Sequence, residues 1–322
     1  MHLVCGAGGF IGGHLVAELR RRGDSPIRAV DIKPLDRWYQ RFDDVENVTG
    51  DLRRVEDCRD ACDGATRVYN LACNMGGMGF IETNKTACMI NVLINTHMLM
   101  AAQEAGVEDY LFASSACVYN IAKQQDAAVS PLGEADAYPA QPEDGYGWEK
   151  LFSERLCRHF AEDFGLRTRA VRLHNVYGPH GTWRGGREKA PAALCRKVIE
   201  AKRSGVPELE IWGDGTQTRS FMWIDDCIDG LLRLDAAPPT QPLNLGSSEL
   251  VTINQLADMT ESIGDVTLRR RYKLDAPRGV AGRNSDNTLL REHLGGWEPS
   301  TSLREGLEQT YRWIEAEFAL QT

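Results

Sequence analysis

Three residues of this sequence have the types and spacing that hydride transfer at a carbinol carbon requires. Tyr146 and Lys150 are four residues apart, so they share one face of a helix. Ser115 lies upstream, at the end of an apolar segment. A neighbouring ammonium favours the phenolate and lowers the pKa of the tyrosine, which can then accept a hydroxyl proton. We therefore expect Ser115, Tyr146 and Lys150 to be catalytic.

A cysteine two residues after Ser115 suggests a second reaction. The Cys117 thiolate could abstract a proton from the carbon next to the carbonyl that hydride transfer creates. Its unperturbed pKa of about 8.5 can be lowered by neighbouring cations. Because cysteine is among the most buried residue types, packing is the alternative interpretation. The proton abstraction would distinguish an epimerase from a plain dehydrogenase.

Alternating short apolar strands and amphipathic helices must position these residues. This pattern predicts a doubly wound α/β fold of the Rossmann type, with a parallel sheet that has helices on both faces. The expected strands are 3–5, 27–30, 68–71, 110–113 and 169–173, and the expected helices are 10–22, 54–62, 84–105 and 145–164. Ser115 would then follow its strand at the carboxyl edge, where such sheets bind ligands.

The second half of the chain predicts a smaller α/β lobe. The long irregular stretch 175–191 is typical of a binding loop, a helix is expected near 191–204, and a strand and helix are expected over 221–235. Further helices would begin at Ile253 and cover 303–318. We expect residues 1–173 and about 221–248 to form the dinucleotide-binding domain. Residues 174–220 and 249–322 would form the lobe that holds a substrate.

A glycine-rich turn follows the first strand and opens the first helix. Glycines there let the backbone approach a pyrophosphate at the helix N-terminus. Asp31 ends the second strand, where a carboxylate binds the ribose hydroxyls and repels a 2'-phosphate, so NAD is favoured over NADP. Asp51 could instead be the N-cap of helix 54–62. The predicted cofactor residues are Gly6, Gly8, Gly9, Phe10, Ile11, Gly12, Asp31, Asp51, Leu52, Leu71, Ala72, Tyr146 and Lys150.

Composition excludes several function classes. A net charge of -9 disfavours nonspecific binding to nucleic acid or to an anionic membrane. The nine cysteines have no paired spacing, which predicts free thiols and a cytoplasmic protein. No metal site is expected, and Cys58 and Cys62 are interpreted as ordinary helix residues. A strand at the starting Met leaves no room for a signal peptide, and no apolar run is long enough to span a bilayer.

The sequence resembles a known family over nearly its whole length. The chain is similar to the extended short-chain dehydrogenase/reductases that act on nucleotide sugars, and among them to the GDP-mannose 3,5-epimerases. The loop that ends in Arg187-Glu-Lys-Ala-Pro191 is the most specific part of this resemblance. The other matching segments are Asn74–Ile81, Ser114–Tyr119, His174–Pro179, Gly181–Ala193, Trp212–Ser220 and Gly282–Asp286.

The resemblance implies an NAD-dependent epimerisation of GDP-mannose at C3, C5 or both. Oxidation at C4 acidifies the neighbouring hydrogens, and inversion then needs a base and an acid on opposite faces. In the family a cysteine and a lysine take these roles, which implies Cys117 and Lys189 here, and we interpret Cys117 as the base. The implied substrate residues are Gly77, Met78, Ser115, Cys117, Asn175, Glu188, Lys189, Lys197, Gln217, Arg219 and Arg283.

Two positions depart from the plant-type members of this family. Asn74 stands where they have aspartate, and Asn120 where they have proline. Both lie near the expected sugar site, so they bear on whether the product is GDP-L-galactose or GDP-L-gulose. The charged run Arg269–Arg271 could bind phosphate, but we interpret it as a strand whose alternate residues face water.

Two other functions fit parts of the pattern. A nucleotide-sugar 4-epimerase, which would act on a UDP-sugar, needs Ser115, Tyr146 and Lys150 but neither Cys117 nor Lys189. An idle NAD-binding sensor or scaffold would have lost part of the redox set. Helices 84–105 and 145–164 carry apolar residues on more than one face, which predicts pairing of helices in a homodimer.

Overall fold

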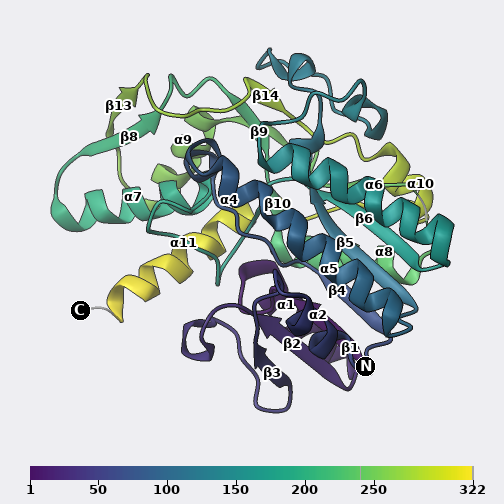
Figure 1. Cartoon of the computed structure of the whole chain (residues 1–322). Coiled ribbons are helices and arrows are strands. Elements are labelled where there is room, and N and C mark those ends of the chain that lie inside the picture. Colours follow the sequence, from purple (N-terminus) through teal and green to yellow (C-terminus); the bar gives the residue numbers. More distant parts are fainter. Residues whose placement is uncertain (240, 321–322) are drawn as a thin grey trace.

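A parallel sheet of seven strands forms the centre of the protein, in the order β11-β6-β5-β4-β1-β2-β3 (Figure 1). The computed structural model describes residues 1–239 and 241–320, so positions 240, 321 and 322 of the predicted domains lie outside the described residues. Every neighbouring pair of strands in this sheet is parallel. The strands are β1 (His2–Cys5), β2 (Ile27–Asp31), β3 (Glu46–Thr49), β4 (Arg67–Asn70), β5 (Asp109–Ser115), β6 (Arg167–Leu173) and β11 (Leu243–Leu245).

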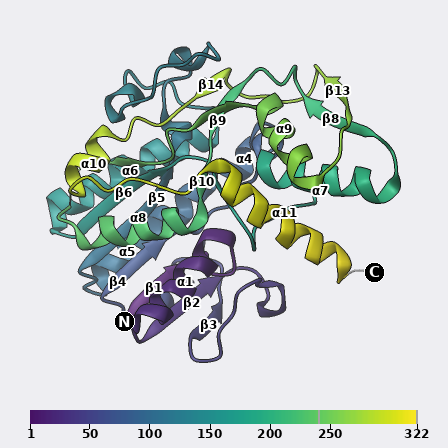
Figure 2. The same cartoon turned by 180° about the vertical axis from the view of Figure 1, so that it is seen from behind.

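Helices cover both faces of this sheet (Figures 1 and 2). Successive residues of a strand point to opposite faces of the sheet. On β1, Leu3 therefore packs into the apolar cluster on one face and Val4 into the cluster on the other. The Leu3 side contains α2 (Val55–Cys62), α5 (Asn91–Glu104) and α6 (Tyr146–Phe164), and the Val4 side contains α1 (Phe10–Arg22) and α8 (Ile224–Ala236). The predicted doubly wound sheet is confirmed.

Two details of the first half differ from the prediction. The expected helix 84–105 is two helices, α4 (Lys85–Met89) and α5, and α3 (Met78–Thr83) precedes them. Asn91 begins α5, and its Oδ1 accepts a hydrogen bond of 2.8 Å from the backbone N–H of Asn74. The first turn of α5 thus anchors the loop after β4. Asp51 is not a helix cap, because Arg54 is the N-cap residue of α2.

The rest of the chain forms smaller sheets and a helical layer in which α7, α9 and α11 pack together. Strands β8 and β13 pair in parallel, and β9 lies between β12 and β14. The remaining strands are β7 (Val176–Tyr177), β8 (Glu208–Trp212), β9 (Thr218–Ser220), β10 (Met222–Trp223), β12 (Leu250–Thr252), β13 (Arg269–Lys273) and β14 (Gly282–Arg283). The remaining helices are α7 (Ala190–Ser204), α9 (Ile253–Gly264), α10 (Thr288–His293) and α11 (Leu303–Ala319), and short 3-10 helices cover Leu35–Arg37, Ala116–Val118, Ile121–Gln124 and Glu134–Ala137.

The basic run on β13 and the cysteines are as the sequence predicted. Arg269 and Arg271 lie on β13 and form ion pairs with Glu208 and Glu210, so this basic run is a strand rather than a free phosphate site. All nine cysteines are free. Within the described part of the chain, no cluster of metal-ligating side chains is present. None of the helices of residues 1–239 and 241–320 is long and apolar enough to cross a membrane.

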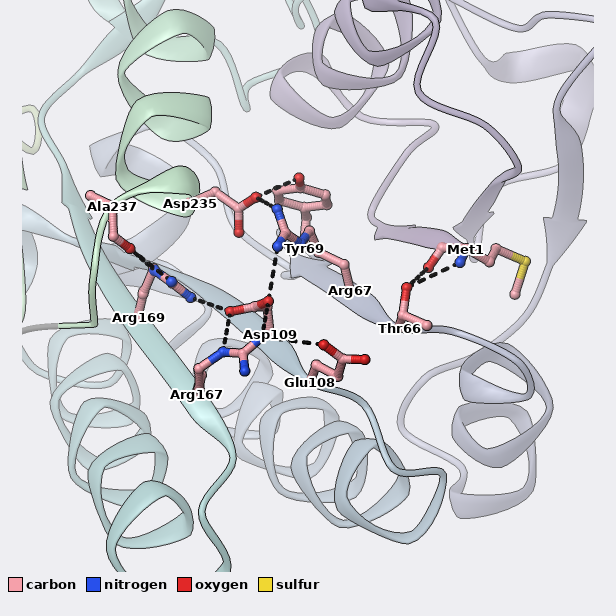
Figure 3. A network of polar contacts seen from close by, with 10 residues as sticks. All are labelled: Met1, Thr66, Arg67, Tyr69, Glu108, Asp109, Arg167, Arg169, Asp235 and Ala237. Atoms are coloured by element: carbon pink, nitrogen blue, oxygen red, sulfur yellow. Dashed lines mark hydrogen bonds and ion pairs between the residues drawn. The ribbon is translucent and has the colours of Figure 1, made fainter.

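A charged network ties the amino ends of three strands together (Figure 3). Asp109 begins β5 and accepts hydrogen bonds from Arg67 of β4 and from Arg167 and Arg169 of β6, at 2.7–3.0 Å. Arg67 also pairs with Asp235 of α8 at 2.6 Å. The network therefore joins the sheet to the last turn of α8, at the edge opposite the carboxyl ends of the strands.

Candidate active site

A cavity of about 680 Å³ lies at the carboxyl ends of the strands. Gly6 follows β1, Asp31 ends β2, Ser115 ends β5 and Leu173 ends β6, and all four line this cavity. Parallel sheets bind ligands at this edge because the loops that follow the strands meet there. Most of the predicted catalytic and cofactor residues therefore come from distant parts of the sequence to one place.

The glycine-rich turn has the close backbone packing that a dinucleotide site requires. A Cβ atom on Gly12 would lie 2.2 Å from the carbonyl oxygen of Gly6, and Gly6 itself has a φ of +80°. Both positions thus exclude a side chain and leave the helix N-terminus open to a pyrophosphate. Gly8 does not line the cavity, since it packs against Trp38. The other predicted cofactor residues that line it are Gly9, Phe10, Ile11, Asp51, Leu52, Leu71, Ala72, Tyr146 and Lys150.

Lys150 is buried beneath the cavity floor on α6. Its ammonium lies 4.7 Å from the ring centroid of Phe112, 5.5 Å from that of Tyr146, and 3.7 Å from Glu149 Oε2. Burial by itself lowers the pKa of Lys150, but Cys73 and Glu149 outweigh it and hold the pKa above its ordinary value. Lys150 is therefore a permanent cation behind Tyr146.

The sequence predicted a lowered pKa for Tyr146, and the structure has the opposite direction. Burial raises the pKa of Tyr146 well above its ordinary value, and the nearby Cys73, Cys117 and Glu149 raise it further. Glu149 pairs with Lys150, so the ammonium does not act on Tyr146 alone. The protein by itself keeps Tyr146 protonated, and formation of the phenolate requires further positive charge in the cavity.

Cys117 lies beside this set in the short 3-10 helix after β5. Its backbone N–H donates to Ser115 Oγ at 3.2 Å, which orients the Ser115 side chain. The thiol is 3.5 Å from Nη1 of Arg283, a residue of β14. Burial and then Glu143 raise the pKa of Cys117 to about 12, and Arg283 opposes this rise. Cys117 packs against Tyr146 but does not itself line the main cavity.

Lys189 lines the same cavity, at the N-cap of α7. No residue of the described chain forms a hydrogen bond or ion pair with its ammonium, and burial lowers the pKa of Lys189. Cys117, Cys227 and Cys73 are close enough to oppose this shift. The structure thus brings Lys189 together with the redox set and with Cys117.

Comparisons with known proteins agree with this geometry. The model of the NAD dependent epimerase/dehydratase family matches residues 2–246, which ends just after β11. The chain belongs to this family. Among its relatives, GDP-mannose 3,5-epimerase 1 of Oryza sativa subsp. japonica is 46% identical over 97% of this chain and 81% of the relative. GDP-mannose 3,5-epimerase of Arabidopsis thaliana is 45% identical over the same shares.

The fold of this chain is also similar to that of a solved structure. MoeE5 in complex with UDP-glucose and NAD is 30% identical to the chain, with a TM-score of 0.81 over 98% of this chain and 99% of that one. The fold of this chain is therefore similar over nearly its whole length to that of a protein whose structure was solved with a nucleotide sugar and NAD. The carboxyl edge that carries the cavity here is the edge where such folds bind their ligands.

The substrate residues implied by the family form two groups around the cavity. Ser115 and Lys189 line it, whereas the others do not, and they lie on α3, α7, β9 and β14 and on the loops between such elements. Lys197 is 3.5 Å from Glu210 Oε1, and Arg219 donates to the carbonyl oxygens of Thr218 and Val280. Asn175 Nδ2 donates to Ser220 O, Glu188 pairs with Arg196, and Gln217 Nε2 donates to Trp212 O. Gly77 lies against the carbonyl of Glu188, and Met78 lies against Gly279.

Sequence reasoning missed two residues of this site. Glu143 precedes α6 and forms an ion pair of 2.5 Å with Arg283 next to Cys117. Gln124 Oε1 accepts a hydrogen bond of 2.7 Å from Arg283 Nε. The segment around Glu143 has the composition of an ordinary loop, so the sequence holds no local signal for its role.

Proposed function

We propose that the protein epimerises GDP-mannose at C3, C5 or both, through transient oxidation at C4, and yields GDP-L-galactose, GDP-L-gulose or both. One observation carries this proposal: a single cavity joins Ser115, Tyr146 and Lys150 to Lys189, with Cys117 packed against Tyr146. A nucleotide-sugar 4-epimerase does not need Cys117 or Lys189. The identity of 46% to GDP-mannose 3,5-epimerase 1 over 97% of the chain supports the same substrate.

NAD fits the cavity, since the glycine turn leaves the helix N-terminus free of side chains and Asp31 lies where ribose hydroxyls bind. When bound, NAD supplies the acceptor for the C4 hydride and its donor after inversion. Tyr146, as the phenolate that the positive charge of NAD would favour, accepts the C4 hydroxyl proton and later returns it, and Ser115 holds the same oxygen. Cys117 and Lys189 exchange protons with the carbon next to C4, whose carbanion is delocalised into the ketone as an enolate.

A nucleoside diphosphate needs local cations on a protein of net charge -9. Lys197 and Arg283 are our candidates for the diphosphate and sugar ligands, with Arg219 adding positive potential. Burial together with the neighbouring Arg283 lowers the pKa of Arg219 to about 10, and the guanidinium stays charged at neutral pH. The pocket for the sugar is completed by Gly77, Met78, Asn175, Glu188 and Gln217.

Asn74 and Asn120, the two residues that differ from the plant-type members of the family, lie in different surroundings. Asn74 lines the cavity, and its Oδ1 accepts a hydrogen bond of 2.9 Å from Arg187. Asn120 is buried, donates to Pro139 O and accepts from the backbone N–H of Ala122. Of the two, Asn74 is therefore our candidate for influence on the ratio of C3 to C5 inversion.

The proposal is tested by proton NMR of GDP-mannose incubated with the protein and NAD in heavy water. We expect a new epimer and loss of the proton signal at C5, C3 or both. UDP-glucose and UDP-galactose are the comparison substrates, and interconversion of these two without reaction of GDP-mannose would show a 4-epimerase instead. Tight NAD binding with no reaction of any sugar would support the idle sensor or scaffold.

We also propose that the protein is a homodimer that pairs through α5 and α6. Apolar side chains on α4 to α6 are 39–53% exposed in the single chain, namely Met89, Leu93, Met100, Trp148 and Phe152. Phe152→Asp should convert the dimer to a monomer, because it would place a charge inside an apolar interface. Sedimentation velocity measures the change. Leu274→Asp, at a residue that is 73% exposed beyond β13, should stay dimeric, and a monomeric wild-type protein would contradict the proposal.

The domain division and the location are part of the same proposal. We propose a dinucleotide-binding domain of residues 1–173 and about 221–248, with residues 174–220 and 249–322 as the nucleotide-sugar lobe. The position of β11 beside β6 supports the return of the chain to the first domain.

We propose a cytoplasmic location, which the nine free cysteines support.

A further inference from the structure

Glu149 and Lys150 are neighbours on α6, and both side chains are buried. Neighbouring residues of a helix point about 100° apart, so the two side chains face different surroundings. Helix α6 packs against both β5 and α5. Lys150 lies against the ring of Phe112 on β5, whereas Glu149 contacts Asn95 on α5. The helix that carries Tyr146 and Lys150 therefore also places a carboxylate inside the protein.

The Oε1 atom of Glu149 is held by two hydrogen bonds. Asn95 Nδ2 and Ser153 Oγ both donate to it, the second at 3.0 Å. Asn95 Oδ1 in turn accepts a hydrogen bond of 3.0 Å from Asn70 Nδ2, at the end of β4. These side chains are all buried, so they fix the carboxylate in one orientation between α5 and the sheet. Two donors on one oxygen stabilise the ionised form of a carboxyl group.

The other oxygen of Glu149 faces Lys150. Glu149 Oε2 has no hydrogen-bond partner among the described residues, and it lies 3.7 Å from Lys150 Nζ. Two charges buried away from water are only weakly screened. The Lys150 ammonium also lies 5.5 Å from the ring centroid of Tyr146. Lys150 therefore acts on Tyr146 together with an opposite charge from Glu149, which contributes to the raised pKa of Tyr146.

The other titratable groups around this pair are thiols. They come from the loop after β4, from α4, from the 3-10 helix after β5 and from α6, and they are Cys73, Cys88, Cys117 and Cys157. Burial raises the pKa of each of these thiols, so they are neutral near pH 7. A neutral thiol does not balance an ammonium. Glu149 is therefore the group that balances Lys150.

The charge of Glu149 matters at both stages of a reversible oxidation at C4. Oxidation moves the C4 hydroxyl proton to the Tyr146 phenolate and the C4 hydride to the nicotinamide, and the return reverses both transfers. The nicotinamide ring is positive before the transfer and neutral after it, while Tyr146 changes from an anion to a neutral phenol. Because Glu149 and Lys150 cancel each other, the buried set is neutral at both stages. Without Glu149, the ammonium would favour loss of the Tyr146 proton while the sugar is a ketone.

We propose that Glu149 is a positioning residue that balances the charge of Lys150, so that Tyr146 ionises only beside a positive nicotinamide and keeps the proton from C4 until it is returned. This inference rests on the proposed oxidation at C4. An enzyme that reverses its own oxidation needs this retention, because the ketone is reduced only if the hydride and the proton are both still in the site. A dehydrogenase that releases its oxidised product has no such need.

Ionisation of Tyr146 can be measured without turnover. ADP-ribose fills a dinucleotide site but lacks the nicotinamide, so it is the probe for a cavity without the positive ring. The ultraviolet tyrosinate absorbance of each protein, minus that of its Tyr146→Phe counterpart, follows Tyr146 as the pH rises. With ADP-ribose bound, Tyr146 in Glu149→Gln should ionise at a pH about one unit or more below that of the wild type. Ionisation that is no lower in Glu149→Gln would overturn the role of Glu149.

Two further variants complete this titration. Glu162→Gln removes an exposed carboxylate from the same helix, which pairs with Arg158 and His159, and it should match the wild type. Calorimetry of ADP-ribose binding shows which variants are folded. If Glu149→Gln does not bind, Glu149→Gln combined with Lys150→Met takes its place, since it leaves no unpaired buried charge. With NAD bound, Tyr146 in this double variant should ionise near the wild-type pH, and a rise of about one unit or more would show that Glu149 does not balance Lys150.

A second measurement uses GDP-mannose and NAD. The near-ultraviolet absorbance of the reduced nicotinamide reports how much cofactor is reduced during turnover. In Glu149→Gln at neutral pH, this fraction should rise about tenfold while epimer forms more slowly, because Tyr146 loses the proton that the ketone needs. Slower epimer formation without more reduced cofactor would contradict retention of the proton. Absence of any reaction with the wild-type protein would contradict the proposed function instead, and the ADP-ribose titration would still decide the role of Glu149.

Discussion

Tyr146→Phe should lower the rate of epimer formation by about 10²–10⁴-fold. The substitution removes the hydroxyl that exchanges a proton with the C4 oxygen, and it leaves the ring in place against Cys117 and Lys150. NAD affinity should change little, because the glycine turn and Asp31 are untouched. Epimer formation is measured by proton NMR of GDP-mannose, and NAD affinity by calorimetry.

The matched control is Tyr272→Phe. Tyr272 lies on β13, is 45% exposed, and donates a hydrogen bond of 3.2 Å to Asn254 Oδ1 away from the cavity. This variant should keep the wild-type rate. A Tyr146→Phe protein that binds NAD and retains more than a tenth of the wild-type rate would remove Tyr146 from the proton transfer.

Asp109→Asn should lower the free energy of unfolding by about 2–3 kcal/mol. This loss is smaller than for a fully buried ion pair, because two of the three arginine partners of Asp109 are partly exposed. Hydrogen bonds from Arg167, then from Arg169 and Arg67, outweigh the effect of burial and hold the pKa of Asp109 far below its ordinary value. The pKa of this carboxyl is lower in the folded state. Its contribution is therefore complete above the unfolded pKa of about 3.9 and is lost as the pH falls below it.

Urea denaturation of the variant and the wild type at pH 7 and at successively lower pH measures this effect. The difference between the two proteins should be largest at pH 7 and should shrink below about pH 4. Glu108→Gln is the control, because Glu108 is exposed and its pair with Arg167 is 3.3 Å long. Its loss should change stability by less than about 1 kcal/mol. An equal loss of stability in both variants would mean that the ion pairs of Asp109 contribute no more than the exposed pair of Glu108.

Much of the fold could be predicted because its signals are local. The alternation of apolar strands and helices predicted five of the seven strands by range, and the helix that carries Tyr146 and Lys150 begins at Tyr146. The glycine turn could be predicted as well, since the need for glycine at Gly6 and Gly12 comes from backbone contacts within one short segment.

What could not be predicted depends on contacts between distant segments. Glu143 is part of the site because of its contact with Arg283, which lies 140 residues further along the chain. The upward shift of the pKa of Tyr146 depends on its burial, and on the thiols and the Glu149 carboxylate that the fold places around it. The break between α4 and α5 at Ile90 carries no glycine or proline, and it follows from the bond of Asn91 to the loop after β4.

The place of β11 in the sheet sets the order in which the chain can finish folding during synthesis. Leu243 pairs with Val171 of β6, and the segments that form β7 to β10 are made between these two strands. While the ribosome makes that segment, the outer edge of β6 has no neighbour, and an open strand edge invites pairing with other chains. A fragment that stops after Leu173 would keep this edge exposed, so we expect such a fragment to associate with other chains. The end of the family match, at residue 246, coincides with the closure of this edge.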